Sequence, residues 1–129
     1  MAVTILLNKV NQKINRPIVT ISPKIKRLSL NRSAVLMMTS HTQASQFVQI
    51  LMDSDKKDVF WVRFCDEEST GSIKLDKTST FTRTCSVTPL VHLLRGKINE
   101  KTRFPMSWDE SMNAGKIDVL NPVTLDSGI

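Results

Sequence analysis

Two β-rich runs in the middle of the chain constrain its fold most strongly: Phe47–Met52 and Val59–Cys65. A wholly polar segment, residues 53–58, separates them. Every second residue in each run is a large apolar one, which is the period of a strand with one buried face. These residues are Val48, Ile50, Met52, Phe60, Val62 and Phe64. The pattern predicts an antiparallel hairpin whose loop is longer than the common two-residue type.

Shorter segments on both sides of this hairpin predict further strands. Strands are expected at 18–22, 27–30, 72–75 and 80–86, and a last hairpin is expected from 103–108 and 116–120 across an Asn113-Ala114-Gly115 turn. A short helix over Ser33–Thr39, with Asn31 as its N-cap, is apolar on all sides and is therefore expected to be buried between other elements. Thr88 and Pro89 read as the N-cap and first residue of a second helix, Pro89–Ile98.

These elements together predict an α+β fold. The chain has 129 residues, with 40% hydrophobic and 23% charged residues, which suits one domain with one core. We expect a single domain with a mainly antiparallel sheet of about six to eight strands and two short helices. Residues 1–16 would form a basic N-terminal arm or edge strand, 17–121 the domain, and 122–129 a C-terminal tail. The order strand, helix, hairpin occurs twice, in 27–65 and 80–120, so two halves related by a pseudo-twofold axis are possible.

The charge distribution is the strongest functional signal. The first seven charged residues are all basic, and the first acidic residue is Asp53. The net charge is +6, and the excess lies in the first quarter of the chain. Such a field predicts an acidic partner, such as nucleic acid or an anionic surface, although a run of cations can also be a solvated surface that maintains solubility.

Seven residues are candidates for contacts with nucleic acid. Five cations would contact phosphates: Arg16, Lys24, Lys26, Arg27 and Arg32. Trp61 and Arg63 lie two apart on a predicted strand and project from the same face, where the indole could stack on a base beside a phosphate contact. The alternative for this pair is a core tryptophan covered by the aliphatic part of the arginine. Trp108 shares a face with Phe104 and Met106 and is expected in the core.

No arrangement of residues predicts catalysis, a metal site or a cofactor. Cys65 and Cys85 are too few for a disulfide framework, and two reduced, half-buried thiols are typical of a cytoplasmic protein. His41 and His92 have no neighbours at metal-ligand spacing, although a cysteine–histidine pair or another enzyme site that the sequence hides stays open. No apolar run is long enough to span a membrane. The acid-free start also suits an organelle targeting peptide, but the strand expected at 18–21 favours a folded segment.

Residues 25–64 resemble the AbrB-like swapped-hairpin DNA-binding domains. In that family a strand ending in a basic–apolar–polar–apolar stretch leads into a short helix and then a hairpin. Arg27-Leu28-Ser29-Leu30-Asn31-Arg32 stands where that strand enters the helix, Val35–Met38 stands for the helix, and Phe47–Met52 with Val59–Phe64 stands for the hairpin. The family's Gly before the strand, its Pro at the strand end and its Gly-Asp turn are missing here. The resemblance covers about a third of the chain and implies an intertwined dimer that binds DNA.

The sequence therefore predicts a small non-enzymatic binding protein that contacts nucleic-acid backbone through its basic N-terminal region, with little base specificity. The alternative is a protein–protein interaction or self-assembly module. Exposed sheet edges and the alternating residues Val3, Ile5 and Leu7 would then support strand exchange and a homo-oligomer.

Overall fold

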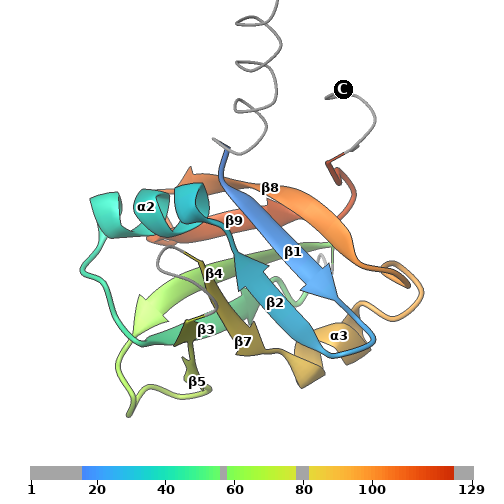
Figure 1. Ribbon diagram of the computed structural model, residues 1–129, viewed down its shortest axis with the longest axis horizontal. Helices are drawn as coiled ribbons and strands as arrows, with labels where there is room; N and C mark the ends of the chain where they lie inside the picture. Colours follow the sequence, from blue (N-terminus) through green and yellow to red (C-terminus); the bar gives the residue numbers. More distant parts are fainter. Residues whose placement is uncertain (1–15, 56–57, 78–81, 124–129) are drawn as a thin grey trace, which may run out of the picture.

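A computed structural model describes residues 16–55, 58–77 and 82–123. Within these ranges the strands are β1 (Ile18–Ser22), β2 (Arg27–Leu30), β3 (Phe47–Met52), β4 (Val59–Cys65), β5 (Ile73–Lys74), β6 (Asp76–Lys77), β7 (Arg83–Ser86), β8 (Thr102–Asp109) and β9 (Ala114–Asp118), and the helices are α2 (Arg32–His41) and α3 (Thr88–Leu93). The nine strands form one antiparallel sheet in the order β5-β3-β4-β9-β8-β1-β2-β7-β6 (Figure 1). The predicted fold class is confirmed: one domain, mainly antiparallel sheet, with two short helices.

The sheet curls into a nearly closed barrel because its first and last strands are neighbours in sequence. Only Leu75 separates β5 from β6. β5 pairs with β3, where Lys74 lies opposite Phe47. β6 pairs with β7, where Asp76 lies opposite Thr84. The Leu75 backbone N–H donates to the Gln46 carbonyl at 2.8 Å, and the leucine side chain is buried. One short stretch of chain therefore joins both ends of the sheet.

The hydrophobic core fills the inside of this barrel. Its largest fully buried side chains include Phe60 on β4 and Phe104 on β8. The alternation expected for the central hairpin is present in part. Val48, Phe60 and Val62 are fully buried, whereas Ile50, Met52 and Phe64 are half-buried and pack against the core. β9 carries Gly115 at a point of close approach, where an added Cβ would lie 2.9 Å from the Met106 Cγ atom of β8. Glycine therefore lets these two strands pack closely inside the barrel.

The strand order has the pseudo-twofold pattern that the sequence suggested. β2 pairs with β7, and β4 pairs with β9, both antiparallel, so each of these strands meets its counterpart from the other half. The β3–β4 hairpin corresponds to the β8–β9 hairpin. β1, which pairs with β2 and β8, corresponds to the β5–β6 stretch, which pairs with β7 and β3. Exchanging the two halves leaves every pairing in place.

The first helix, α2, is longer and less buried than predicted. Asn31 caps it as expected: its Oδ1 accepts from the backbone N–H of Ala34 at 2.9 Å. Ala34 and Met38 are buried, but Leu36 is 53% exposed, so the expectation that the helix is covered on all sides is wrong. One face packs on the barrel, where α2 contacts β1, β2, β8 and β9, and the other face is open to solvent.

The second helix, α3, is shorter than predicted. It ends at Leu93 because the chain then turns through Gly96, which has a φ of +89°. Its N-cap is Val87, with no side-chain hydrogen bond, so the assignment of Thr88 as the cap is wrong. Burial of Leu94 and Ile98 persists beyond the helix end, since the turn keeps the apolar face directed inward.

Four further expectations need correction in the second half. Ala114 and Gly115 belong to β9, and the turn occupies residues 110–113, because the Asp109 carboxylate accepts hydrogen bonds from the backbone N–H groups of Ser111 and Met112. The strand expected at 72–75 is two short strands with Leu75 between them, and the one expected at 80–86 starts at Arg83, with 80–81 outside the described residues. Trp108 is half-buried rather than core and stacks on His41, with ring centroids 4.5 Å apart.

Candidate nucleic-acid interface

The five predicted phosphate contacts do not gather in one patch. Lys24 and Lys26 are exposed in the turn between β1 and β2. Arg16 and Arg32 are also exposed but lie at the opposite ends of these two strands, where the Asn31 side chain donates to the Arg16 carbonyl at 2.7 Å. A five-residue strand such as β1 is about 17 Å long, so the two groups are well separated. Lys9 and Lys13, the other two early cations, lie outside the described residues.

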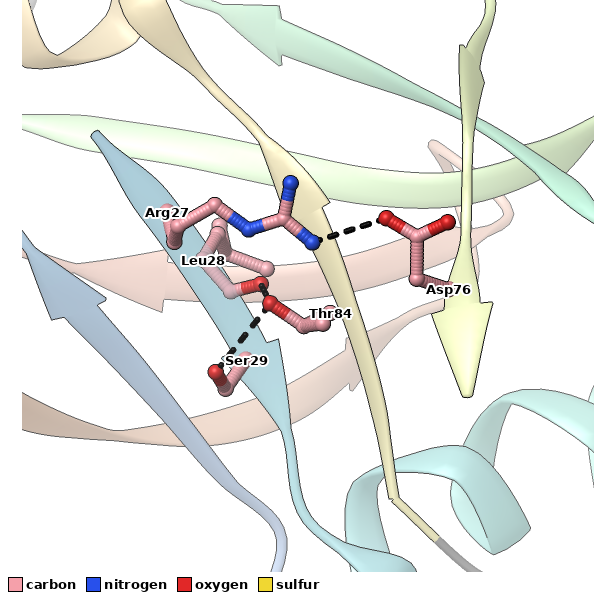
Figure 2. A network of polar contacts seen from close by, with 5 residues as sticks. All are labelled: Arg27, Leu28, Ser29, Asp76 and Thr84. Carbon is pink, nitrogen blue, oxygen red and sulfur yellow. Dashed lines mark hydrogen bonds and ion pairs between the residues drawn. The ribbon is translucent and has the colours of Figure 1, made fainter. Parts of the chain in front are cut away.

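Arg27 is engaged in an ion pair on the outer face of the barrel. Its Nη2 donates to the Asp76 Oδ2 at 2.8 Å, so the side chain reaches from β2 across β7 to β6 (Figure 2). Beside it, Thr84 Oγ1 donates to the Leu28 carbonyl at 3.0 Å, and Ser29 Oγ donates to Thr84 Oγ1 at 3.4 Å (Figure 2). Arg27 thus links β2 to β6 at the end of the sheet. A phosphate would have to compete with Asp76 for the Arg27 guanidinium.

The β1–β2 turn and the end of α3 bring three cations together. α3 lies beside this turn (Figure 1), and the Val87 backbone N–H donates to the Lys26 carbonyl at 2.9 Å. A cavity of about 280 Å³ lies between them, with Lys24, Lys26 and Arg95 in its lining and no carboxylate. These three cations make no ion pair with any residue that the structure describes. We call them the turn–helix surface.

Arg95 is the member of this surface that sequence reasoning missed. Its Nη2 lies 2.9 Å from the His92 Nδ1. Because a guanidinium has only donors, the histidine ring accepts here, which orients Arg95 beside the lysines. Only the folded chain brings Arg95 to the β1–β2 turn, because the two segments are far apart in sequence. Two exposed apolar residues flank the cations: Ile25 is 68% and Leu93 52% exposed.

Trp61 and Arg63 share the outer face of β4, as predicted, but neither side chain is fully exposed. The Trp61 indole N–H donates to the Asp109 Oδ2 at 3.0 Å. Hydrogen bonds from Ser111 and then Trp61 hold the pKa of Asp109 below its ordinary value. Lys116 of β9 lies directly opposite Trp61 in the register. The indole is therefore fixed at its edge, with one cation along its own strand and another across from it.

The two thiols are neutral, and His41 is stacked on a tryptophan. Both cysteines are free, as predicted: Cys85 faces the core opposite Leu28, and Cys65 is half-buried. Burial raises the pKa of Cys85 to about 12 and also raises that of Cys65. Both groups are therefore neutral thiols near pH 7 and poor nucleophiles. His41 is stacked on Trp108. In the described part of the chain, no group of three His, Cys, Asp or Glu residues could hold a metal ion.

No protein-family model, curated protein or solved structure matches this chain. The described helices include none with the length and apolar character needed to cross a lipid bilayer.

Proposed function

We propose that this protein binds the phosphate backbone of a nucleic acid through the turn–helix surface and does not catalyse a reaction. The observation that supports this proposal is the lining of the cavity between the β1–β2 turn and α3, in which Lys24, Lys26 and Arg95 meet without a carboxylate. Cations that are not neutralised by a neighbouring carboxylate attract polyanions, and condensed counterions are released from the polyanion when they bind.

The surface is suited to contact with backbone rather than to reading of sequence. Lysine ammonium groups on flexible stems bind phosphates as point charges, and the guanidinium of Arg95 adds a directional donor. No asparagine or glutamine side chain lies with these cations except Asn99, at the rim of the cavity. Ile25 and Leu93 offer apolar area to sugars beside the phosphates. We therefore expect weak discrimination between sequences and a strong dependence on salt.

The other predicted contacts enter the proposal separately. Arg16 and Arg32 lie at the other end of β1 and β2, so they would meet a second stretch of backbone. Trp61, with Lys116 opposite, would meet a base and its phosphate on the outer face of β4, whereas Arg63 on the same face donates to Gln49. The turn–helix surface does not depend on either group.

A charge reversal with a matched control tests the proposal. Lys24→Glu with Lys26→Glu is compared with Lys74→Glu and Lys77→Glu, which change the net charge equally at exposed positions on β5 and β6. Fluorescence anisotropy measures affinity for a short single strand and a short duplex at two salt concentrations. We expect the first variant to lose affinity on the order of tenfold or more and its salt slope on duplex to fall by about two. Equal losses in both variants, or no loss in the first, would overturn the proposal.

Self-assembly by strand addition gains little support from the described residues. The ends of the sheet are the two-residue strands β5 and β6, which are short templates for another chain. The alternating residues Val3, Ile5 and Leu7 lie outside the described residues, so their role in exchange stays a prediction. Light scattering on a chain without residues 1–15 separates the two ideas, since a shift to lower mass supports assembly.

A further inference from the structure

A larger cavity, of about 530 Å³, lies where the loop after α2 meets the outer face of β3 and β4. Its lining is polar and includes Gln49, Arg63, Asp66 and Asn113. It contains none of the residues of the turn–helix surface, so an inference about it does not rest on the proposed function.

Arg63 is held in this cavity by a single partner that fixes its orientation. Gln49 lies opposite it in the β3–β4 register, and the Gln49 Oε1 accepts from the Arg63 Nε at 3.0 Å. The Gln49 Nε2 in turn donates to the Thr70 carbonyl at 2.8 Å, which fixes the amide. One edge of the guanidinium is thus engaged. The terminal Nη1 and Nη2 groups make no hydrogen bond or ion pair with the described residues.

Most hydroxyl groups around the cavity are already used within the protein. Ser45 Oγ donates to the Cys65 carbonyl at 2.6 Å, and Ser69 Oγ accepts from the Asp66 backbone N–H at 3.2 Å. The terminal groups of Arg63 and the side-chain amides of Gln43 and Asn113 make no hydrogen bond with the residues that the structure describes. Asn113 holds its place at the rim with a φ of +53°, in the turn before β9. The two amides offer acceptors as well as donors and the Asp66 carboxylate offers only acceptors, so the Arg63 fork is the group in this lining that suits an oxyanion.

We propose that this cavity binds a small molecule through a carboxylate group, which accepts two hydrogen bonds from the Nη1 and Nη2 of Arg63. The planar fork of a guanidinium matches the two oxygens of a carboxylate. Asp66 is the one acidic residue in the lining and balances one positive charge. A ligand group with a single negative charge is therefore favoured over a phosphate dianion, which Asp66 would repel more strongly.

The test is a titration followed by the ¹⁵N NMR signal of the Arg63 side-chain N–H. Sodium acetate is added to the full-length protein, with sodium chloride at the same ionic strength as the reference and inorganic phosphate as the competing chemistry. We expect a saturable shift with acetate, a weaker response to phosphate and no saturation with chloride. A linear shift with acetate, or equal binding of phosphate and acetate, would overturn the proposal.

Matched variants separate the fork from the charge. Arg63→Lys keeps the positive charge but loses the fork, and we expect acetate affinity, followed by backbone signals of Ser69 and Asn113, to fall on the order of tenfold. Lys116→Gln removes a cation from the neighbouring strand and is expected to bind acetate normally. Equal affinity in Arg63→Lys and the unaltered protein would refute the role of the fork.

Two further variants sharpen the assignment. Gln49→Leu leaves Arg63 in place but frees its Nε, so we expect acetate affinity to fall several-fold, because the guanidinium is no longer oriented. Asp66→Asn removes the repulsion and is expected to raise phosphate affinity relative to acetate. The Lys24→Glu and Lys26→Glu variant should bind acetate normally. Loss of acetate binding therefore tests the Arg63 cavity, whereas loss of nucleic-acid binding tests the turn–helix surface.

Discussion

The half of the barrel that contains α2 and the half that contains α3 use corresponding positions for the core but different ones for the surface. Ala34 and Met38 face inward from α2, and Leu90 and Leu94 occupy the corresponding places in and after α3. The β3–β4 and β8–β9 hairpins also correspond, since Val48 is the first buried residue of β3 and Phe104 is the first buried residue of β8. The inner faces therefore determine the shared architecture of the two halves.

The two halves differ in how each helix is attached and in what lies outside. α2 has ten residues and a side-chain cap from Asn31, whereas α3 has six residues and no side-chain cap. The turn–helix surface takes two cations from the first half and Arg95 from the second. The two halves therefore share their inward-facing residues but differ in their outward-facing ones. Both candidate binding surfaces lie where the two halves meet.

Removing a core side chain that contacts both halves should lower the free energy of unfolding more than any other change considered. Phe60 is fully buried on β4, opposite Ile117 of the other half. Phe60→Ala should lower the free energy of unfolding by about 3–5 kcal/mol. Because the halves share one core, urea unfolding should stay a single transition. Trp61 fluorescence in a Trp108→Phe background and Trp108 fluorescence in a Trp61→Phe background should report the same midpoint, and separate midpoints would show that the halves unfold independently.

Alkaline pH should destabilise the protein through its buried thiols, and Cys85 should contribute more than Cys65 because it is the more deeply buried of the two. Cys85 lies opposite Leu28, and burial raises its pKa from 9.0 to about 12. The unfolded thiol therefore loses its proton at lower pH than the folded one. This stabilisation is fully present below pH 9 and is lost as the pH rises toward 12, by roughly 1.4 kcal/mol per pH unit.

Urea unfolding at a series of alkaline pH values measures this loss. The chain contains no tyrosine, so phenol ionisation does not add to it. Cys85→Ala removes the thiol and should flatten the decline with pH, although it lowers stability at neutral pH. An unchanged alkaline slope in Cys85→Ala would show that another group is responsible.

The helix caps give the smallest expected effect. Asn31 accepts from Ala34 and from Ile18 and donates to Arg16, which ties α2 to the start of β1. Asn31→Ala should cost about 1–2 kcal/mol in thermal or urea unfolding. Thr88→Ala, at the start of α3, should change stability by less than about 0.5 kcal/mol, because no cap bond is lost there.

An intermediate variant separates the contributions of Asn31. Asn31→Asp keeps the acceptor oxygen that serves the two N–H groups but loses the donor to the Arg16 carbonyl, so its cost should be smaller than that of Asn31→Ala. Equal costs for Asn31→Ala and Thr88→Ala would contradict the proposed difference between the two helices.

The central strands were predictable because their burial follows from alternation within one segment. The bounds of β3 and β4 match the predicted runs, and β1 and β2 also match. β5 and β6 were not predictable as two strands, since each has two residues and their separation at Leu75 depends on partners far away in sequence. The turn before β9 was misplaced because the hydrogen bonds of Asp109, rather than Gly115, set its position.

The candidate surfaces were predictable only in part, because charge is a property of sequence and proximity is not. Lys24 and Lys26 stood out from the charge distribution alone. Arg95 joins them, and Asp76 engages Arg27, through contacts between segments far apart in the chain. The cavity at Arg63 depends on the loop after α2 and on Asn113, and nothing in the spacing of these residues indicates that they meet.

The pairing of β2 with β7 and of β4 with β9 has a consequence for how the molecule could be divided. A cut in the loop at residues 66–72 would yield one piece with β1 to β4 and another with β5 to β9. β2 and β4 would lose their partners in the first piece, and β7 and β9 would lose theirs in the second. Neither piece could form a ring alone, because isolated hairpins are marginally stable in water. The two fragments would complement each other, so this barrel offers a natural site for a split reporter whose signal depends on reassembly.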